Sequence, residues 1–294
     1  MGVTLNVDLA LPLDEARAAL LDELAGVEGV ELELEATEGG TKATLTLAPE
    51  LEARELAGWF ASLVRAARPE AYDDWFTDRV ARRPSGAQAR EVYADPLYHW
   101  PNFRAILHEL ALTADDRLLE VGCGGGAFLH EALKSGCTAA AIDHSPDMVR
   151  LASRQNAEAI EAGRLQIVEG DAASLPFADE TFTAAVMTGV LGFLPDPVAA
   201  FAEIRRVLVP GGRMIALGAD PALKGTPAAP EPIASRLHFY TDEEHELIGR
   251  DAGLDDVRVE RIPLGEFARE AGVPEEALPL FEGAGTPFLL AHRH

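Results

Sequence analysis

From residue 114 to its end, the chain alternates short apolar runs with segments of helical apolar spacing. The apolar runs include D-R-L-L-E-V-G, T-A-A-A-I-D and F-T-A-A-V-M-T-G, and helical patterns such as P-V-A-A-F-A-E-I-R-R-V-L stand between them. Apolar strands that alternate with helices are typical of a mostly parallel sheet with helices on both faces. We therefore expect a doubly wound α/β fold, in which a ligand binds beyond the carboxyl ends of the strands.

A glycine-rich loop, G-C-G-G-G at 122–126, follows the first of these strands directly. Glycine is needed where the backbone turns tightly or approaches a ligand without a Cβ. We expect the amides of this loop to point toward the ligand. Gly122, Gly124 and Ala127 also satisfy the dinucleotide fingerprint, with alanine in the last place. The loop alone therefore leaves two cofactor classes open, a dinucleotide and S-adenosylmethionine.

Acidic residues stand at the carboxyl ends of the first three strands. Glu120 lies two residues before the first loop glycine, where its charge repels a pyrophosphate but suits an ammonium group. Asp143 ends the second strand, 21 residues after Gly122, where a carboxylate can accept both hydroxyls of a ribose. Asp171 ends the third strand, where it can accept from an adenine amino group. These carboxylates favour S-adenosylmethionine.

Five short pieces in a fixed order carry a family resemblance. The order E-V-G-C-G-G-G, I-D-H-S-P-D-M, E-G-D-A-A-S-L-P-F, L-P-D-P and L-V-P-G-G-R resembles the class I S-adenosylmethionine-dependent methyltransferases. It is most similar to the small-molecule group that includes the ubiquinone and menaquinone biosynthesis methyltransferases, over about residues 90–294. The resemblance implies a Rossmann-like, seven-stranded sheet whose last strand is antiparallel. It also implies S-adenosylmethionine as cofactor and S-adenosylhomocysteine as product.

The resemblance implies a role for each matching residue in holding the cofactor. The loop glycines would line its methionine part, Glu120 its amino group and Asp143 its ribose. Residues after the second and third strands would meet the adenine, and those that end the fourth would approach the transferring methyl group. The expected cofactor-binding residues are Glu120, Gly122, Cys123, Gly124, Gly126, Asp143, His144, Met148, Asp171, Ala172, Thr188 and Gly189.

The acceptor side offers no obvious base. Related enzymes often carry a histidine or polar pair just after the fourth strand, but 189–193 reads G-V-L-G-F. This departure favours a nucleophile that needs little activation, such as a thiol or soft metalloid, or one deprotonated from elsewhere. Two clusters, 93–100 and 236–241, supply polar candidates, and 264–285 is a candidate lid. We predict His238, Tyr98 and Tyr240 as catalytic residues, and Tyr93, His99, Trp100 and Arg236 as substrate or lid residues.

The first 50 residues differ from the rest of the chain. Strand alternation, a helical pattern and the hairpin V-E-L-E-L-E-A-T-E-G-G-T-K-A-T-L-T-L-A predict a small β-α-β-β unit. Such a small unit needs a packing partner, so we expect it to pack on the main domain or to form a homodimer. We predict a helical linker over 51–88 and the methyltransferase domain over 89–294. The aromatic residues Trp59, Phe60, Trp75 and Phe76 fall on the linker helices and are expected in a core.

Charge and cysteine usage narrow the partners. The net charge is −24, with 49 acidic and 25 basic residues, so nucleic acid and anionic membranes are disfavoured. No run reaches the apolar length of a membrane span, and the start of the chain lacks signal-peptide features. The two cysteines show neither metal-type nor disulfide-scaffold spacing. We expect a cytoplasmic enzyme with no metal and a small-molecule acceptor. The alternatives are a nicotinamide-dependent oxidoreductase and a non-catalytic cofactor-binding protein.

Overall fold

The computed structural model describes residues 3–9, 11–24, 29–48, 73–74, 76–226 and 229–294. The chain divides into two compact units, Met1–Ala89 and Arg90–His294. The helix expected over 49–68 lies outside the described residues, as do Trp59, Phe60 and Trp75. Of the next expected helix the structure describes 73–74 and 76–81, and these residues run into the short helix η1 (Asp78–Arg82).

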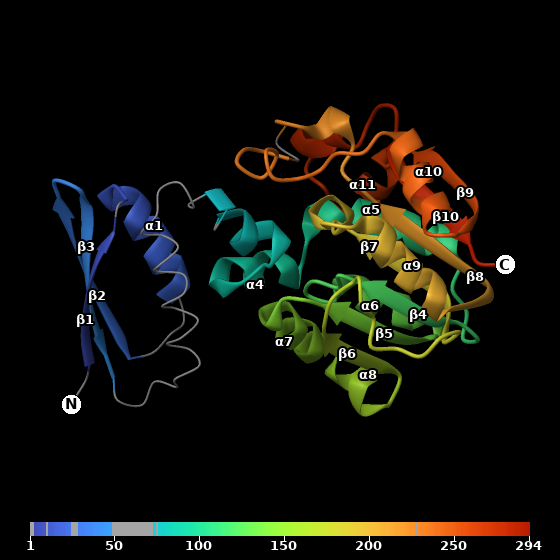
Figure 1. The fold of residues 1–294 in the computed structure, drawn as a ribbon, viewed down its shortest axis with the longest axis horizontal. Helices are drawn as coiled ribbons and strands as arrows, with labels where there is room; N and C mark the ends of the chain where they lie inside the picture. The colour runs from blue at the N-terminus through green and yellow to red at the C-terminus, as the bar shows by residue number, and fades with distance from the viewer. Residues whose placement is uncertain (1–2, 10, 25–28, 49–72, 75, 227–228) are drawn as a thin grey trace. The chain divides into compact units, whose positions relative to one another are not determined.

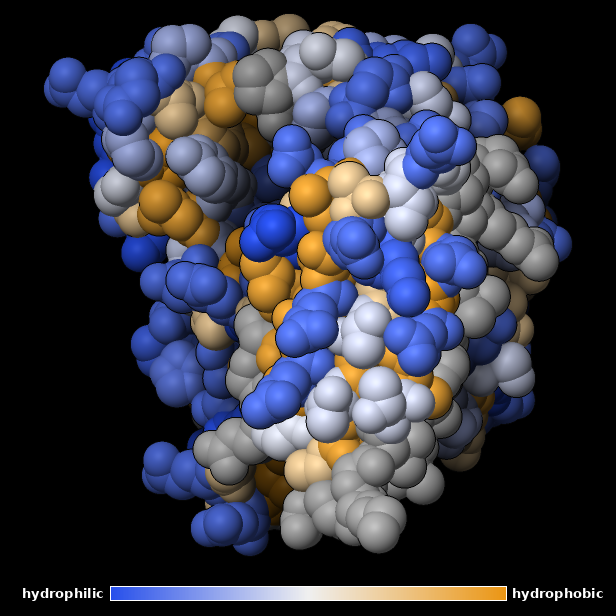
Figure 2. Space-filling model, turned by 90° about the vertical axis from the view of Figure 1, so that its left-hand side faces the viewer, coloured by the Kyte–Doolittle hydropathy of each residue, from blue (hydrophilic) through white to orange (hydrophobic). Residues whose placement is uncertain are grey.

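The first unit contains the predicted β-α-β-β arrangement. Its elements are β1 (Val3–Leu9), α1 (Leu13–Leu24), β2 (Val30–Thr37) and β3 (Gly40–Leu47), and the three strands form an antiparallel sheet in the order β1-β3-β2. Leu45 and Leu47 of β3 are buried with Leu20 of α1 in a small apolar core. Along β2, exposed glutamates alternate with the partly buried Leu32 and Leu34, as expected for a strand buried on one face. Hydrophilic side chains also cover much of the face shown in Figure 2.

The second unit contains a seven-stranded sheet in the order β6-β5-β4-β7-β8-β10-β9. Its strands are β4 (Arg117–Val121), β5 (Thr138–Asp143), β6 (Leu165–Glu169), β7 (Phe182–Thr188), β8 (Leu208–Leu217), β9 (Asp255–Ile262) and β10 (Thr286–His292). Neighbours from β6 to β8 pair in parallel, whereas β10 pairs antiparallel with both β8 and β9. This arrangement confirms the predicted fold class, including the antiparallel last strand.

Helices cover both faces of the sheet (Figure 1). The described helices are α4 (Gly86–Ala94), η2 (Leu97–His99), α5 (Trp100–Leu110), α6 (Ala127–Ala132), η3 (Leu133–Ser135), α7 (Pro146–Gln155), α8 (Ala157–Glu161), η4 (Leu191–Phe193), α9 (Pro197–Val207), η5 (Pro221–Leu223), α10 (Asp242–Asp251), α11 (Gly265–Glu270) and η6 (Glu275–Leu280). Side chains of α5, α6, α7 and α8 enter the core on one face, and those of α9 and α10 enter the core on the other.

Two elements differ in detail from their sequence patterns. The sequence P-D-M-V-R-L-A-S-R-Q-N-A-E-A-I-E-A-G (146–163) predicts a single helix, but the helix breaks at Asn156, whose buried amide donates to the carbonyls of Gly126 and Ala152. This side chain ties the helix to the glycine loop, so the break positions the site. The sequence V-P-G-G (209–212) predicts a turn that leads into a strand, but in the structure it lies inside β8. It bulges out of the ladder, because β7 residues Phe182 and Ala184 pair with Leu208 and Arg213.

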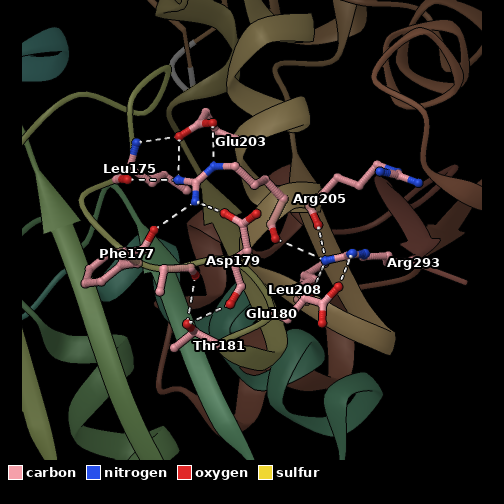
Figure 3. Close-up of polar contacts among 11 residues, drawn as sticks. Leu175, Phe177, Asp179, Glu180, Thr181, Glu203, Arg205, Leu208 and Arg293 are labelled. Atoms are coloured by element: carbon pink, nitrogen blue, oxygen red, sulfur yellow. Dashed lines mark hydrogen bonds and ion pairs between the residues drawn. The ribbon is translucent and has the colours of Figure 1, made fainter.

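A network around Arg206 of α9 holds the segment between β6 and β7 in place (Figure 3). Its guanidinium donates to the carboxylates of Glu203 and Asp179 and to the carbonyls of Leu175 and Phe177. The hydrogen bonds from Arg206 lower the pKa of Glu203. Charge-assisted bonds of this kind are stronger than neutral ones. The network thereby anchors the end of the segment that begins with the predicted adenine contacts.

Candidate active site

The glycine loop is folded back onto the second strand of the parallel sheet. The amides of Gly122 and Cys123 both donate to the carbonyl of Ile142, at 2.8 and 3.2 Å. Gly122 has φ +79°, and a Cβ there would lie 2.1 Å from Cγ2 of Val190, so only glycine fits. The expectation that the loop amides point toward a ligand is wrong for these two. A pyrophosphate uses free amides, so this arrangement disfavours a dinucleotide.

Glu120 is a buried carboxylate with an unsatisfied oxygen. The residue is 2% exposed in β4, and its Oε2 atom has no hydrogen-bond partner. Burial, with a further contribution from the charge of Asp143, raises the pKa of Glu120 well above its ordinary value. A buried acceptor without a partner costs about 1–3 kcal/mol. This cost is removed when a donor, and above all a cationic one, binds at this point.

Asp143 ends β5 and joins three parts of the site. Its Oδ2 accepts from the Gly124 amide and its Oδ1 from the Ser145 amide, each at 2.8 Å. An ionised carboxylate offers about four acceptor positions, so one such group can serve several donors at once. Ser145 caps α7 by accepting from the amide of Met148, whose side chain is fully buried. Asp143 thus fixes the loop and presents acceptors beside it.

The end of α4 covers the glycine loop. A Cβ at Gly125 would lie 2.0 Å from the carbonyl oxygen of Tyr93, and a Cβ at Gly124 would lie 2.9 Å from the Tyr93 ring. Burial and the nearby charge of Asp143 raise the pKa of the Tyr93 phenol, so the phenol keeps its proton. The structure therefore places Tyr93, predicted as a lid residue, directly over the loop.

The remaining predicted cofactor residues stand at the edge formed by the strand ends. His144 and Asp171 are exposed, and Asp171 accepts from the Ala173 amide at 2.9 Å. Gly189 follows β7 with φ +68° and open space where a Cβ would stand. Burial raises the pKa of the Cys123 thiol, which keeps it protonated and unreactive. Ala172 and Thr188 are half-buried, Ala172 against the core and Thr188 at the end of β7.

The structure brings the 236–241 cluster to the loop after β7. The His238 amide donates to the Gly192 carbonyl at 2.9 Å, and a Cβ at Gly192 would lie 2.6 Å from Leu237. The rings of His238 and Tyr240 are in contact, with centroids 4.3 Å apart. His238 is exposed and Tyr240 buried. Two predicted catalytic residues therefore stand beside the apolar 189–193 segment. Arg236 donates to the Pro232 carbonyl.

The other predicted cluster lies on η2 and the start of α5. Tyr98 is 54% exposed, and His99 is exposed and stacks on Phe103. Trp100 donates its indole N–H to Asp95 at 2.7 Å and contacts Phe103 edge to face. The candidate lid 264–285 forms α11 and η6, and a small cluster of its apolar side chains packs against Leu97 of η2.

One buried polar residue at this edge is absent from the predicted set. His245, in the first turn of α10, is 1% exposed, and neither ring nitrogen has a hydrogen-bond partner. Its ring contacts Tyr240, with centroids 5.6 Å apart. Helical spacing offered a signal, because His245 shares a buried face with Ile248 and Gly249. The strand-end motifs do not indicate His245, because it lies on a helix.

The described residues fit a ligand that carries an ammonium group and a ribose diol. Glu120 offers a buried, unpartnered oxygen, and Asp143 places a carboxylate at the end of the adjacent strand. Gly122 and Gly125 leave no room for side chains. These features match S-adenosylmethionine, which has both groups and no phosphate. Within the described ranges, no group of three or more His, Cys, Asp or Glu side chains suits a metal ion.

Comparisons with known proteins agree with this geometry. Residues 119–216 match the methyltransferase domain family. Demethylmenaquinone methyltransferase of Lactiplantibacillus plantarum is 26% identical over 204 residues, covering 60% of this chain and 85% of the relative. The 27-O-demethylrifamycin SV methyltransferase of Amycolatopsis mediterranei is 29% identical over 224 residues, covering 66% and 82%. Coverage is lower for the demethylmenaquinone methyltransferase of Tropheryma whipplei, of which the chain spans 46%.

A solved structure shows the same fold. Geranyl diphosphate methyltransferase, solved in complex with GPP and sinefungin, superposes with a TM-score of 0.51 at 20% identity, covering 66% of this chain and 77% of that protein. No helix in the described parts of the chain has the length and apolar character to cross a membrane. These matches favour neither the nicotinamide-dependent nor the non-catalytic alternative. The matched domain, the named relatives and the fold together support a class I S-adenosylmethionine-dependent methyltransferase that acts on small molecules.

Proposed function

We propose that this enzyme holds S-adenosylmethionine over the ends of β4, β5 and β6 and methylates a hydroxylated, aromatic small molecule held at the ends of β7 and β8. The observation that carries the cofactor placement is the buried, unpartnered Oε2 of Glu120 beside Asp143 and the glycine loop. The placement of the acceptor rests on the aromatic and apolar residues that lie around 189–193.

Each part of the cofactor has a matching group in the proposed placement. Glu120 accepts from its ammonium group, and Asp143 accepts from its ribose hydroxyls. The exposed His144 packs beside the adenine, whose amino group reaches Asp171. Tyr93 closes over the methionine part from α4. The open backbone at Gly189 leaves room for the methyl group to face the acceptor.

The proposed reaction needs alignment more than activation. The sulfonium of S-adenosylmethionine carries an already activated methyl group, which a nucleophile displaces in line. Holding two reactants in that geometry supplies a large part of the rate enhancement. The chain's contribution is a site at the sheet edge that orients the acceptor and excludes water through Val190, Leu191 and Tyr240.

Two observations support the acceptor class. The walls at the end of β7 are apolar and aromatic, which suits a ring. Two relatives are named as methyltransferases of demethylmenaquinone and of 27-O-demethylrifamycin SV. The net charge of −24 disfavours polyanionic acceptors, including nucleic acid.

Free, buried cysteines at 123 and 137 fit a reducing compartment, and we place the enzyme in the cytoplasm.

The acceptor class is tested by following a radiolabelled methyl group from S-adenosylmethionine. The protein is incubated separately with naphthohydroquinone, as a hydroxylated aromatic probe, and with mercaptoethanol, as a thiol probe. We expect label to enter naphthohydroquinone at a rate at least tenfold above the protein-free reaction, and more slowly to enter the thiol. Label that enters only the thiol would contradict the acceptor class while leaving the cofactor placement intact.

We also propose that the β1–β3 unit joins two copies of the chain. Among the described residues, β1 and β2 are the edge strands of its sheet, and edge strands pair readily with other strands. In light scattering, a chain truncated to start near residue 85 is therefore expected to have the mass of one truncated copy, whereas the full chain has the mass of two full copies. The matched comparison is the full chain at the same molar concentration. An unchanged number of copies would rule out this role for the unit.

A further inference from the structure

The buried ring of His245 requires an explanation that packing does not give. Neither Nδ1 nor Nε2 has a hydrogen-bond partner of normal geometry although the residue is 1% exposed, and the Thr241 carbonyl, one helical turn earlier, is the backbone acceptor that acts on the ring. A neutral imidazole has one donor and one acceptor, and either of them destabilises the folded protein when it is buried unsatisfied. Native proteins rarely keep such groups without a water, an ion or a ligand to meet them.

His245 lies at the ends of β7 and β8. A Cβ at Gly218, the residue after β8, would lie 2.1 Å from Nε2 of His245. The same Cβ would lie 3.1 Å from Cδ2 of Leu191, in the segment that follows β7. Glycine at 218 therefore lets the imidazole reach the strand end beside Leu191. This is the edge where we place the acceptor.

Adjacent residues link this ring to the proposed cofactor loop. Val190 precedes Leu191 and contacts Gly122, where a Cβ would lie 2.1 Å from its Cγ2 atom. The ends of β4, β7 and β8 are neighbours in the sheet. His245 thus stands across the 189–193 segment from the glycine loop.

A row of rings connects His245 with solvent. The Tyr240 ring lies 5.6 Å from that of His245 and 4.3 Å from that of the exposed His238. Tyr240 is 8% exposed.

We propose that His245 binds the hydroxyl of an aromatic methyl acceptor and takes its proton during transfer, an inference that rests on the proposed function. The acceptor O–H bond breaks and its proton passes to the lone pair of a ring nitrogen. An oxygen–methyl bond forms as the methyl–sulfur bond breaks, and that bond's electron pair stays on sulfur. The proton leaves to solvent with the product. This residue supplies the base that 189–193 lacks.

The surroundings of His245 suit this role. Burial lowers the pKa of His245, while Asp242, the Thr241 carbonyl, Asp220 and Glu244 oppose that shift. The ring is therefore neutral at neutral pH and has a lone pair to accept a proton. The carboxylates then stabilise the imidazolium that forms. The neighbouring ring, Tyr240, stays a neutral phenol, because burial and the charge of Glu244 raise its pKa.

The test follows the imidazole nitrogen resonances of the full chain prepared with isotope-labelled histidine. Phenol is the probe, and fluorobenzene is its counterpart without a hydroxyl. The His245→Phe variant identifies the His245 signals among the eight histidines. The His292→Phe variant identifies a control, because Nδ1 of His292 is also unpartnered but lies on β10 opposite Arg213, near the other end of β8. Titrations are made with and without S-adenosylhomocysteine.

Phenol is expected to shift the His245 signals, fluorobenzene to leave them in place, and His292 to respond to neither. His245 signals that stay unchanged up to the solubility limit of phenol would overturn the proposal, as would equal shifts with fluorobenzene. Calorimetry with S-adenosylhomocysteine separates the two claims. If S-adenosylhomocysteine does not bind, that result counts against the proposed cofactor site. The response of His245 to phenol is also measured without S-adenosylhomocysteine, so it tests the role of His245 separately.

Discussion

The Asp143→Ala variant is expected to lose measurable binding of S-adenosylhomocysteine. In the proposed placement the carboxylate accepts from two ribose hydroxyls, and it already holds the Gly124 and Ser145 amides. Hydrogen bonds to a charged group contribute about 1.5–3 kcal/mol each. Losing two of them weakens binding about 100-fold or more, since 1.4 kcal/mol is a factor of ten. Isothermal titration calorimetry measures this difference directly.

The matched control is Asp116→Ala, at the opposite end of the sheet. Asp116 is also a buried, hydrogen-bonded carboxylate, which accepts from Thr183 and Arg213. Although burial opposes it, hydrogen bonds from Arg213, Thr113 and Thr183 lower the pKa of Asp116. Its removal is expected to reduce thermal stability while S-adenosylhomocysteine affinity stays within twofold. Equal affinity losses in both variants would show that Asp143 acts through stability alone.

The Glu120→Gln variant is expected to be more stable and to bind cofactor less well. The free protein keeps a buried carboxylate with an unpartnered oxygen, so a neutral amide raises the free energy of unfolding by about 1–3 kcal/mol at neutral pH. The same change removes the negative partner of an ammonium group, and S-adenosylhomocysteine affinity falls about 10- to 100-fold. Chemical denaturation and calorimetry measure the two effects separately.

The pH dependence of this stability difference has a definite sign. The folded-state pKa of Glu120 is raised well above its ordinary value, chiefly by burial. Between the unfolded and folded pKa values the folded state binds the extra proton, so stability falls as the pH rises through that window. Glutamine does not titrate, so the free energy of unfolding of the Glu120→Gln variant does not fall in this way. The difference in stability between the variant and the unaltered protein therefore grows from acid toward neutral pH.

An exposed glutamate supplies the control for that variant. Glu109→Gln on α5 changes the same atoms at the surface, where substitutions usually alter stability by less than about 0.5 kcal/mol. A Glu120→Gln protein that is less stable than the unaltered one at neutral pH would show that the carboxylate is satisfied within the fold. In that case Glu120 would not be held ready for an ammonium group.

The order of the sheet elements could be predicted because each strand carries its own apolar run. The parallel strands are buried on both faces, which makes runs such as 118–121 and 184–187 almost wholly apolar. The positions of Glu120 and Asp143 followed from the same pattern, since parallel strands end at one edge. A family resemblance added the cofactor, which the glycine loop alone left open.

The parts that could not be predicted depend on side chains that meet across the fold. The break at Asn156 arises because its amide reaches the Gly126 carbonyl, 30 residues away. The loop amides are turned inward by Ile142 and Asp143, a contact between strands that no local pattern records. His245 reaches the strand ends because Gly218 has no side chain. Residues 51–72 of the predicted helical linker, which include Trp59, lie outside the described residues, as does Trp75, and they stay a prediction.

The most direct test of the account is calorimetric titration of the unaltered protein, freed of co-purified ligand, with S-adenosylhomocysteine and separately with NAD. The proposed site predicts binding of S-adenosylhomocysteine with a dissociation constant near 1 μM, about −8 kcal/mol, and no heat with NAD. Binding of NAD without S-adenosylhomocysteine, or of neither ligand, would contradict the placement of the cofactor at Glu120 and Asp143.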